Sequence, residues 1–371
     1  MKKKSLGVIL VTFLTAAVFF VGSTSAIAEV IKWRVPTVWT PAITLIHTDQ
    51  YFVKLVNEMC KGELEMRLFG AGEIVNSFEV FSAVQTGTVA AGCDWPGYWA
   101  GKDSAFSVIA AMPAGLDLQT MTTWIFHGGG AAIADEIFGK FGMKYLFTGC
   151  LPPESGVRGA KAYKTINDFK GSKIRMSGLL QGQILKELGA AQVMLAGQEI
   201  YQALEKGVID AAEYSTPDAD WGLGFQEVTK IWNIPGWHQP ASPVGIMINK
   251  KEWDKLPKTL QRKLEIAAQA TYTYALSLFD WDSATYTQKF LDKGIKTSRL
   301  DKTAIAQIQK ASYEIIEKEA AKNPLFAKAA YSQFLTMQHE APWRVIQQGL
   351  HEDMPEKLPN MDALKKAAGV K

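Results

Sequence analysis

The sequence predicts an α/β protein of two lobes with a long bracing helix and a helical C-terminal region. Its 371 residues are enough for two lobes of ordinary domain size and a large core. Strand patterns alternate with helical patterns from residue 31 onward, but the alternation breaks at Pro152-Pro153 and resumes after Gly236. Beyond Trp253 the pattern is helical, which is more helix than two lobes need for covering.

The first 28 residues have the three parts of a secretory signal peptide. Lys2-Lys3-Lys4 is a basic start, residues 6–21 form an apolar run, and Ala26-Ile27-Ala28 is an A-x-A cleavage signal. We therefore expect cleavage near Ala28 and export of the remaining chain. A retained membrane anchor is the alternative, but the apolar run is short for a membrane span.

Residues 29–154 are expected to form the first lobe. Alternating apolar residues predict strands over 31–36 and 64–69, and apolar residues at helical spacing predict a helix over 44–60 between them. Further strands are predicted over 89–93 and 144–149, and the first crossover between lobes is expected after the second of these, around Pro152.

An aromatic loop over 94–99 follows one of these strands and contains Tyr98 and Trp99. Aromatic residues at such a position can be rigid walls of a small-molecule pocket or a buried plug beneath the loop, and the sequence favours neither. Trp39, in the loop after the first strand, is another candidate for the cleft. His127 has no partner at metal-ligand spacing, so a structural role is the favoured interpretation.

Residues 155–240 are expected to form the second lobe. Strands are predicted over 171–177, 191–194 and 208–217, with helices between them. These patterns place Arg175 and Glu213 at the carboxyl ends of neighbouring parallel strands. Ligands bind beyond such ends in open α/β sheets, and a guanidinium group matches a carboxylate in a bidentate way. A simple ion pair joining the two strand ends is the structural alternative.

The remaining chain is expected to return to the first lobe and then to become helical. A strand over 244–249 should re-enter that lobe, and the segment 241–300 should include the bracing helix. Residues 301–371 are expected to be C-terminal helices.

Composition excludes several classes of function. The leader contains three of the 40 basic residues and no acidic ones, so the remaining chain has 37 of each sign and no basic field for nucleic acid or anionic lipid. Cys60, Cys93 and Cys150 have no C-x-x-C or zinc spacing. Each is expected to be a small buried residue, and whether any pair forms a disulfide stays open.

Two motifs resemble the extracytoplasmic solute receptors of tripartite ATP-independent periplasmic (TRAP) transporters. They are D-F-K-G-x-K-I-R over 168–175 and A-L-E-K-G-x-x-D-A over 203–211, and the resemblance covers nearly all of the mature chain. Three shorter segments are similar to the branch that binds 2-oxo or 2-hydroxy acids together with a metal cation. These are Ala212-Glu213-Tyr214, the stretch 69–73, and His127-Gly128-Gly129-Gly130.

The resemblance implies a periplasmic binding protein fold and a periplasmic receptor that delivers a small organic acid to membrane permease subunits without chemistry. It also implies long C-terminal helices that brace the lobes and sometimes mediate a homodimer. A receptor for a signalling partner is one alternative. A metal-dependent enzyme acting on a keto acid is another, but no nucleophile or general base can be traced among separate segments.

A carboxylate-plus-cation site follows from these residues and from the resemblance. Arg175, Tyr98, Trp99, Trp39 and Glu154 are expected to contact the acid. In the related receptors the position of Glu154 usually holds glutamine, and an acid lies near the position of Gln239. Hard oxygen ligands favour Na⁺ or Ca²⁺ over zinc. The expected metal ligands are Glu154, Glu213, the carbonyl of Tyr214, and Gln239.

Overall fold

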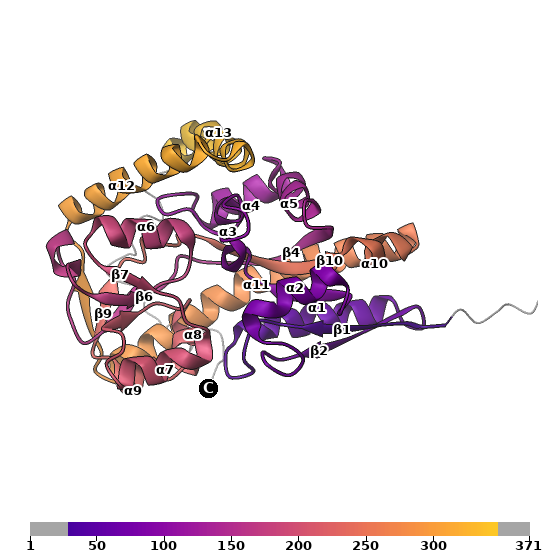
Figure 1. Ribbon diagram of the computed structural model, residues 1–371, viewed down its shortest axis with the longest axis horizontal. Helices are drawn as coiled ribbons and strands as arrows, with labels where there is room; N and C mark the ends of the chain where they lie inside the picture. The colour runs from indigo at the N-terminus through magenta and orange to yellow at the C-terminus, as the bar shows by residue number, and fades with distance from the viewer. Residues whose placement is uncertain (1–28, 348–371) are drawn as a thin grey trace, which may run out of the picture.

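The computed structural model describes residues 29–347 and has two α/β lobes side by side (Figure 1). The predicted signal peptide and the last predicted helical residues, 348–371, lie outside this range. Three sheets organise the described part. They have two, three and six strands.

The first lobe contains the two smaller sheets. In one, β1 (Ile31–Pro36) pairs in parallel with β2 (Leu64–Phe69). In the other, β10 (Ser242–Asn249) lies antiparallel between β3 (Ala91–Asp94) and β4 (Met143–Leu151). Every residue of β10 is buried, as expected of a central strand with apolar side chains on both faces. Strand β10 thus returns the chain to the sheet that contains β3 and β4.

Helices cover the sheets of the first lobe. They are α1 (Leu45–Met59), α2 (Val80–Thr86), α3 (Phe106–Ala110), α4 (Leu118–Phe126), α5 (Gly130–Gly139) and α10 (Lys250–Lys255), with the 3₁₀ turns η1 (Ser77–Glu79) and η2 (Pro96–Trp99).

The second lobe is built on the six-stranded mixed sheet, in the order β11-β9-β5-β8-β6-β7. Its strands are β5 (Val157–Gly159), β6 (Lys173–Arg175), β7 (Ala191–Val193), β8 (Ala211–Ala212), β9 (Ile231–Ile234) and β11 (Lys296–Arg299). Its helices are α6 (Leu179–Glu187), α7 (Gly197–Glu205), α8 (Pro217–Gly222) and α9 (Phe225–Val228), with the 3₁₀ turn η3 (Ile166–Phe169). Strands β6 and β8 are parallel neighbours, so the predicted adjacency of Arg175 and Glu213 is confirmed.

The bracing helix is α11 (Lys258–Asp292), which has 35 residues. It packs on β4 and α1 in the first lobe and on α8 in the second. Strand β11, which follows it, pairs with β9 in the sheet of the second lobe. The segment 241–300 therefore ends in the second lobe, because a helix of this length carries the chain from one lobe to the other.

The last two helices also join the lobes. Helix α12 (Lys302–Ala320) packs on α6 of the second lobe, and α13 (Pro324–Gln347) packs on α3, α4 and α5 of the first lobe. Together they form a layer along one side of both lobes (Figure 1).

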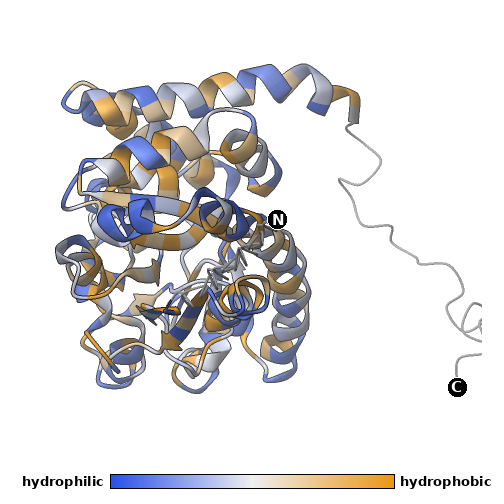
Figure 2. Cartoon of the chain, turned by 90° about the vertical axis from the view of Figure 1, so that its right-hand side faces the viewer, coloured by the Kyte–Doolittle hydropathy of each residue, from blue (hydrophilic) through white to orange (hydrophobic). Residues whose placement is uncertain are grey.

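Apolar residues concentrate on the interior strands, while the outer helices alternate hydrophobic and hydrophilic residues (Figure 2). One hydrophobic cluster runs through both lobes, and a second lies between β1, β2, α1 and α11. The three cysteines are buried and unbridged, as small core residues are. Within residues 29–347, no helix has the length and apolar character needed to cross a membrane.

Candidate functional site

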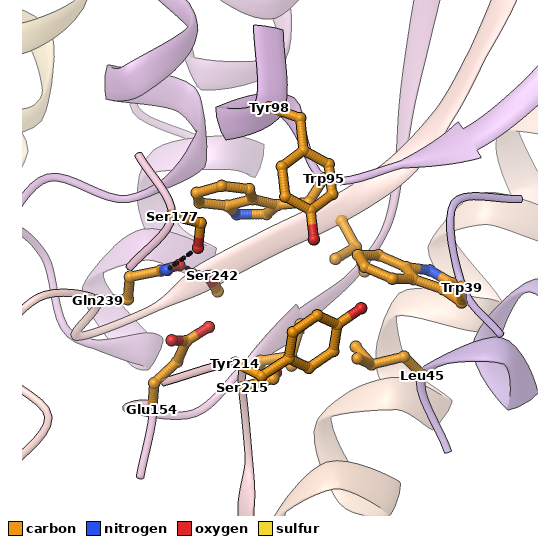
Figure 3. Close-up of a pocket in the computed structure, with 12 residues that line it drawn as sticks. Trp39, Leu45, Trp95, Tyr98, Glu154, Ser177, Tyr214, Ser215, Gln239 and Ser242 are labelled. Atoms are coloured by element: carbon orange, nitrogen blue, oxygen red, sulfur yellow. Dashed lines mark hydrogen bonds between the residues drawn. The ribbon is translucent and has the colours of Figure 1, made fainter. Parts of the chain in front are cut away.

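A small pocket lies where the two lobes meet (Figure 3). The empty space between its lining atoms, including the part open to solvent, is about 270 Å³. The first lobe contributes loops after β1 and β3, and the second contributes the ends of β6 and β8. The segments after β4 and after β9, where the chain crosses between the lobes, complete the lining. Its lining residues are Trp39, Leu45, Trp95, Tyr98, Leu151, Glu154, Ser177, Tyr214, Ser215, Gln239, Ser242 and Val244.

The aromatic wall differs from the sequence expectation at one position. Trp39 and Tyr98 line the pocket, but Trp99 does not. Trp99 is 2% exposed, packs 5.1 Å from the ring of Phe81, and donates its indole N–H to Asp94. The loop forms the 3₁₀ turn η2, in which residues three apart share one face. Trp95 and Tyr98 therefore face the pocket, and Trp99 points into the core.

Arg175 is fully buried and does not line the pocket, but its guanidinium lies 5.1 Å from the ring of the lining residue Tyr214. Its Nη1 donates to the carbonyl oxygen of Glu213 at 2.7 Å and to Glu213 Oε1 at 2.9 Å, while Nε and Nη2 each donate to the carbonyl oxygen of Leu195 at 3.2 Å. A guanidinium has five N–H groups, so these four hydrogen bonds leave one N–H of Nη2 for a ligand. The ion pair considered from the sequence is present, and the anchoring of a ligand carboxylate by Arg175 stays a prediction.

Hydrogen bonds to one carboxylate oxygen, Oε1, hold Glu213 in one orientation. Besides Arg175, Oε1 accepts from the backbone N–H of Ser177 at 2.5 Å and from its hydroxyl at 3.0 Å. The other oxygen, Oε2, is buried and has no hydrogen-bond partner among the described residues. Burial would raise the pKa of Glu213, but Arg175 and His238 lower it to about 2.

Glu154 lies beside a histidine that the sequence analysis missed. His238 Nε2 is 2.9 Å from Glu154 Oε2 and 3.8 Å from Glu213 Oε2. Burial and the nearby Glu213 charge raise the pKa of Glu154 to about 8. Burial would lower the pKa of His238, but the hydrogen bond to Glu154 and the nearby charge of Glu213 raise it to about 9.

His238 could have been found from the sequence only through its neighbour. It precedes Gln239 in the crossover after β9, so a loop that places Gln239 at the pocket also brings His238 close. Metal-ligand spacing along the sequence does not reveal such a residue, because its partners are distant in the chain. His127, the histidine that was considered, is exposed at the end of α4.

The carboxylates and His238 fit a metal cation. One ligand atom from each of Glu154, Glu213 and His238 lies within 4.8 Å of the others, and all three residues are buried. The unpartnered Oε2 of Glu213 is available for coordination. Gln239 is less available, because its Oε1 accepts from the Ser242 hydroxyl at 2.5 Å. Coordination by Gln239 and by the carbonyl of Tyr214 stays a prediction.

A buried ion pair supports the loops that hold these ligands. Asp220 Oδ2 accepts from Arg158 Nε at 2.7 Å and from the Ser155 hydroxyl at 2.6 Å, and Oδ1 accepts from the Ser215 N–H at 3.2 Å. Ser155 follows Glu154, and Ser215 follows Tyr214. The pair therefore fixes the backbone next to two predicted metal ligands.

Comparison with known proteins gives one family. Residues 37–323 match the family described as bacterial extracellular solute-binding protein, family 7. A monocarboxylate 2-oxoacid-binding periplasmic protein of Nostoc is 32% identical over 304 residues, which are 82% of this chain and 83% of that protein. The 2,3-diketo-L-gulonate-binding periplasmic protein of Escherichia coli is 27% identical over 69% of this chain and 77% of its own length.

Two solved structures are similar in fold and in sequence. A TRAP transporter solute-binding protein of Bordetella bronchiseptica, with calcium and picolinate in one site of a dimer, has a TM-score of 0.83 at 27% identity. The match covers 92% of this chain and 98% of that one. A TRAP periplasmic solute-binding protein of Pseudoalteromonas atlantica, with sodium and pyruvate, has a TM-score of 0.84 at 26% identity and covers 88% and 100%.

Proposed function

The chain belongs to family 7 of the bacterial extracellular solute-binding proteins, the receptors of TRAP transporters, and on this premise we propose that it captures a 2-oxo or 2-hydroxy monocarboxylate together with a cation. Relatives with pyruvate and sodium, or pyruvate and calcium, support this class of ligand.

The observation that carries the proposal is the pair of buried carboxylates beside the pocket. Arg175 already compensates Glu213, and a proton shared with His238 compensates Glu154, so these groups leave no positive charge over for a ligand carboxylate. A cation between the two carboxylates would supply that charge. Glu154, Glu213, the Tyr214 carbonyl and Gln239 would hold it, and oxygen ligands alone suit Ca²⁺ or Na⁺.

The walls of the pocket suit a small acid. Trp39, Trp95 and Leu45 present apolar surface, and the hydroxyl groups of Tyr98 and Tyr214 both point into the hollow (Figure 3). Tyrosine hydroxyls can pair with the keto or hydroxyl oxygen of such an acid. The space that can hold the centre of a water-sized sphere is only about 20 Å³, in keeping with a compact substrate.

A thermal-shift screen of organic acids, with and without a chelator, tests this function. A ligand that binds the native state raises the melting temperature by mass action. We expect stabilisation by 2-oxo or 2-hydroxy monocarboxylates in the presence of Ca²⁺ or Na⁺ and a smaller shift after chelation. Stabilisation by sugars or amino acids, and by no acid of this class, would overturn the assignment.

We also propose that the chain performs no chemistry on its ligand. His238 and Glu154 form a histidine–carboxylate pair, which is the feature that an enzyme acting on a keto acid would use as a base. Proton NMR of each stabilising acid incubated with the pure protein separates the two functions. An unchanged acid supports a receptor, and turnover that is lost in His238→Gln would support an enzyme.

Export and a membrane partner complete the proposal. The leader ending near Ala28 directs the chain to the periplasm, where the closed receptor delivers its acid to the permease subunits. N-terminal sequencing of the exported protein tests the cleavage site. Co-purification with a TRAP permease distinguishes transport from a role with a signalling partner.

A homodimer through the C-terminal helices is supported by the surface of α13. This helix exposes several large apolar side chains, namely Tyr331, Leu335, Trp343, Val345 and Ile346. Apolar surface of this kind marks contact sites, and a second copy of the chain is the proposed partner. Sedimentation velocity should show a dimer that Trp343→Ser weakens, and a monomer at all concentrations would exclude it.

A further inference from the structure

His238 lies where a third protein ligand of the cation would lie. It belongs to the crossover between β9 and β10 and is fully buried. Its Nε2 is 2.9 Å from one oxygen of Glu154 and 3.8 Å from the unpartnered oxygen of Glu213. Ligand atoms around a metal with bonds of about 2.0–2.2 Å are separated by roughly 3.4 Å in tetrahedral geometry. The observed separations lie on either side of that value.

The supporting contacts orient the carboxylate towards this point. Three donors, from Arg175 and Ser177, hold Oε1 of Glu213, so its Oε2 faces His238 with no partner of its own within residues 29–347. Metal sites use such outer contacts to fix their ligands. A buried carboxylate oxygen is usually paired, and a cation between Glu213 and His238 would supply the missing partner.

We propose that His238 is a ligand of the bound cation, and that the site therefore takes a divalent ion of the zinc class more tightly than Ca²⁺ or Na⁺. This inference rests on the proposed function as a cation-dependent acid receptor and changes the class of ion. The preference for hard ions followed from oxygen ligands alone, and imidazole nitrogen suits Zn²⁺, Co²⁺ and Cu²⁺. Two carboxylates and one imidazole leave a coordination position for the acid.

The charges agree with a divalent ion. With His238 neutral, as a ligand must be, a divalent ion and Arg175 carry three positive charges. Glu154, Glu213 and a bound monocarboxylate carry three negative charges. A monovalent ion would leave one negative charge buried in the seam between the lobes, which is costly in a low-dielectric site.

Calorimetric titration of the chelator-treated chain with Zn²⁺, Co²⁺, Ca²⁺ and Na⁺ tests the inference. We expect one zinc ion per chain, bound at least about 100-fold more tightly than Ca²⁺. His238→Gln should lose at least about 10-fold in zinc affinity and little in calcium affinity. His127→Gln, at an exposed histidine, is the matched control and should change neither. Zinc affinity no higher than that of calcium, or unchanged in His238→Gln, would overturn the inference.

A second measurement does not depend on a variant that folds. Pulsed electron paramagnetic resonance of the Cu²⁺-loaded parent chain should show the distal nitrogen of one coordinated imidazole. Its absence would overturn the assignment of His238 as a ligand. Failure here is distinct from failure of the proposed function. If an acid binds in the presence of a cation while zinc affinity is no higher than that of calcium, or is unchanged in His238→Gln, the receptor stands without this inference. If no acid binds with any ion, the receptor function falls.

Discussion

Replacing Arg175 with lysine keeps the positive charge near the pocket but removes the planar fork. The guanidinium makes four hydrogen bonds, two to Glu213 and two to the Leu195 carbonyl, and has one N–H left for a ligand. A lysine ammonium donates only three N–H groups from one atom, so it cannot replace the four protein hydrogen bonds and also donate to the acid. The lost charge-assisted hydrogen bond should cost about 2–4 kcal/mol of binding free energy, roughly 30- to 1000-fold in Kd.

Calorimetry with an acid found by the thermal-shift screen, at saturating cation, measures this loss. Urea denaturation in parallel should show a fall of about 1–3 kcal/mol in the free energy of unfolding, because the buried Leu195 carbonyl loses its donors. Arg262→Lys, at an exposed ion pair on α11, is the matched control and should change neither quantity measurably. A folded Arg175→Lys protein with undiminished affinity would show that Arg175 only joins the strand ends.

Three further predictions follow from buried charges. Glu213→Gln should lower both metal content and acid affinity, measured by metal analysis and calorimetry, whereas a purely structural ion pair predicts lost stability with no metal to lose. Asp220→Asn leaves Arg158 buried without its counter-charge and should lower the free energy of unfolding by about 3–5 kcal/mol, measured by urea denaturation. The double variant Arg158→Met with Asp220→Leu should lower it much less, and equal losses would refute this account. Burial raises the pKa of Asp94 to about 8, so the folded protein keeps a proton that the unfolded chain releases above its ordinary pKa near 3.8. Stability should therefore decline as the pH rises from about 4 to 8, and Asp94→Asn should flatten that decline in melts at pH 5 and 9, while an unchanged slope would exclude Asp94 as its source.

Periodic patterns in the sequence determined the fold class and the strands that carry Arg175 and Glu213. Alternating residues located β6 and β10, and helical spacing located α11, because the burial of one face or of a whole strand leaves a local signal. Arg175 and Glu213 could be paired from the sequence because parallel strands end at the same edge of a sheet.

Tertiary packing decided what local patterns do not encode. The sequence could not separate Trp95 from Trp99, because only the 3₁₀ turn at residues 96–99 determines which ring faces the pocket. It missed His238 because the partners of this residue lie 84 and 25 positions away, on another crossover and another strand. It predicted that the guanidinium of Arg175 is free to bind a ligand, but hydrogen bonds to Leu195 and Glu213 use most of its N–H groups. Hydrogen bonds between distant segments depend on the folded geometry, and neither residue type nor spacing records them.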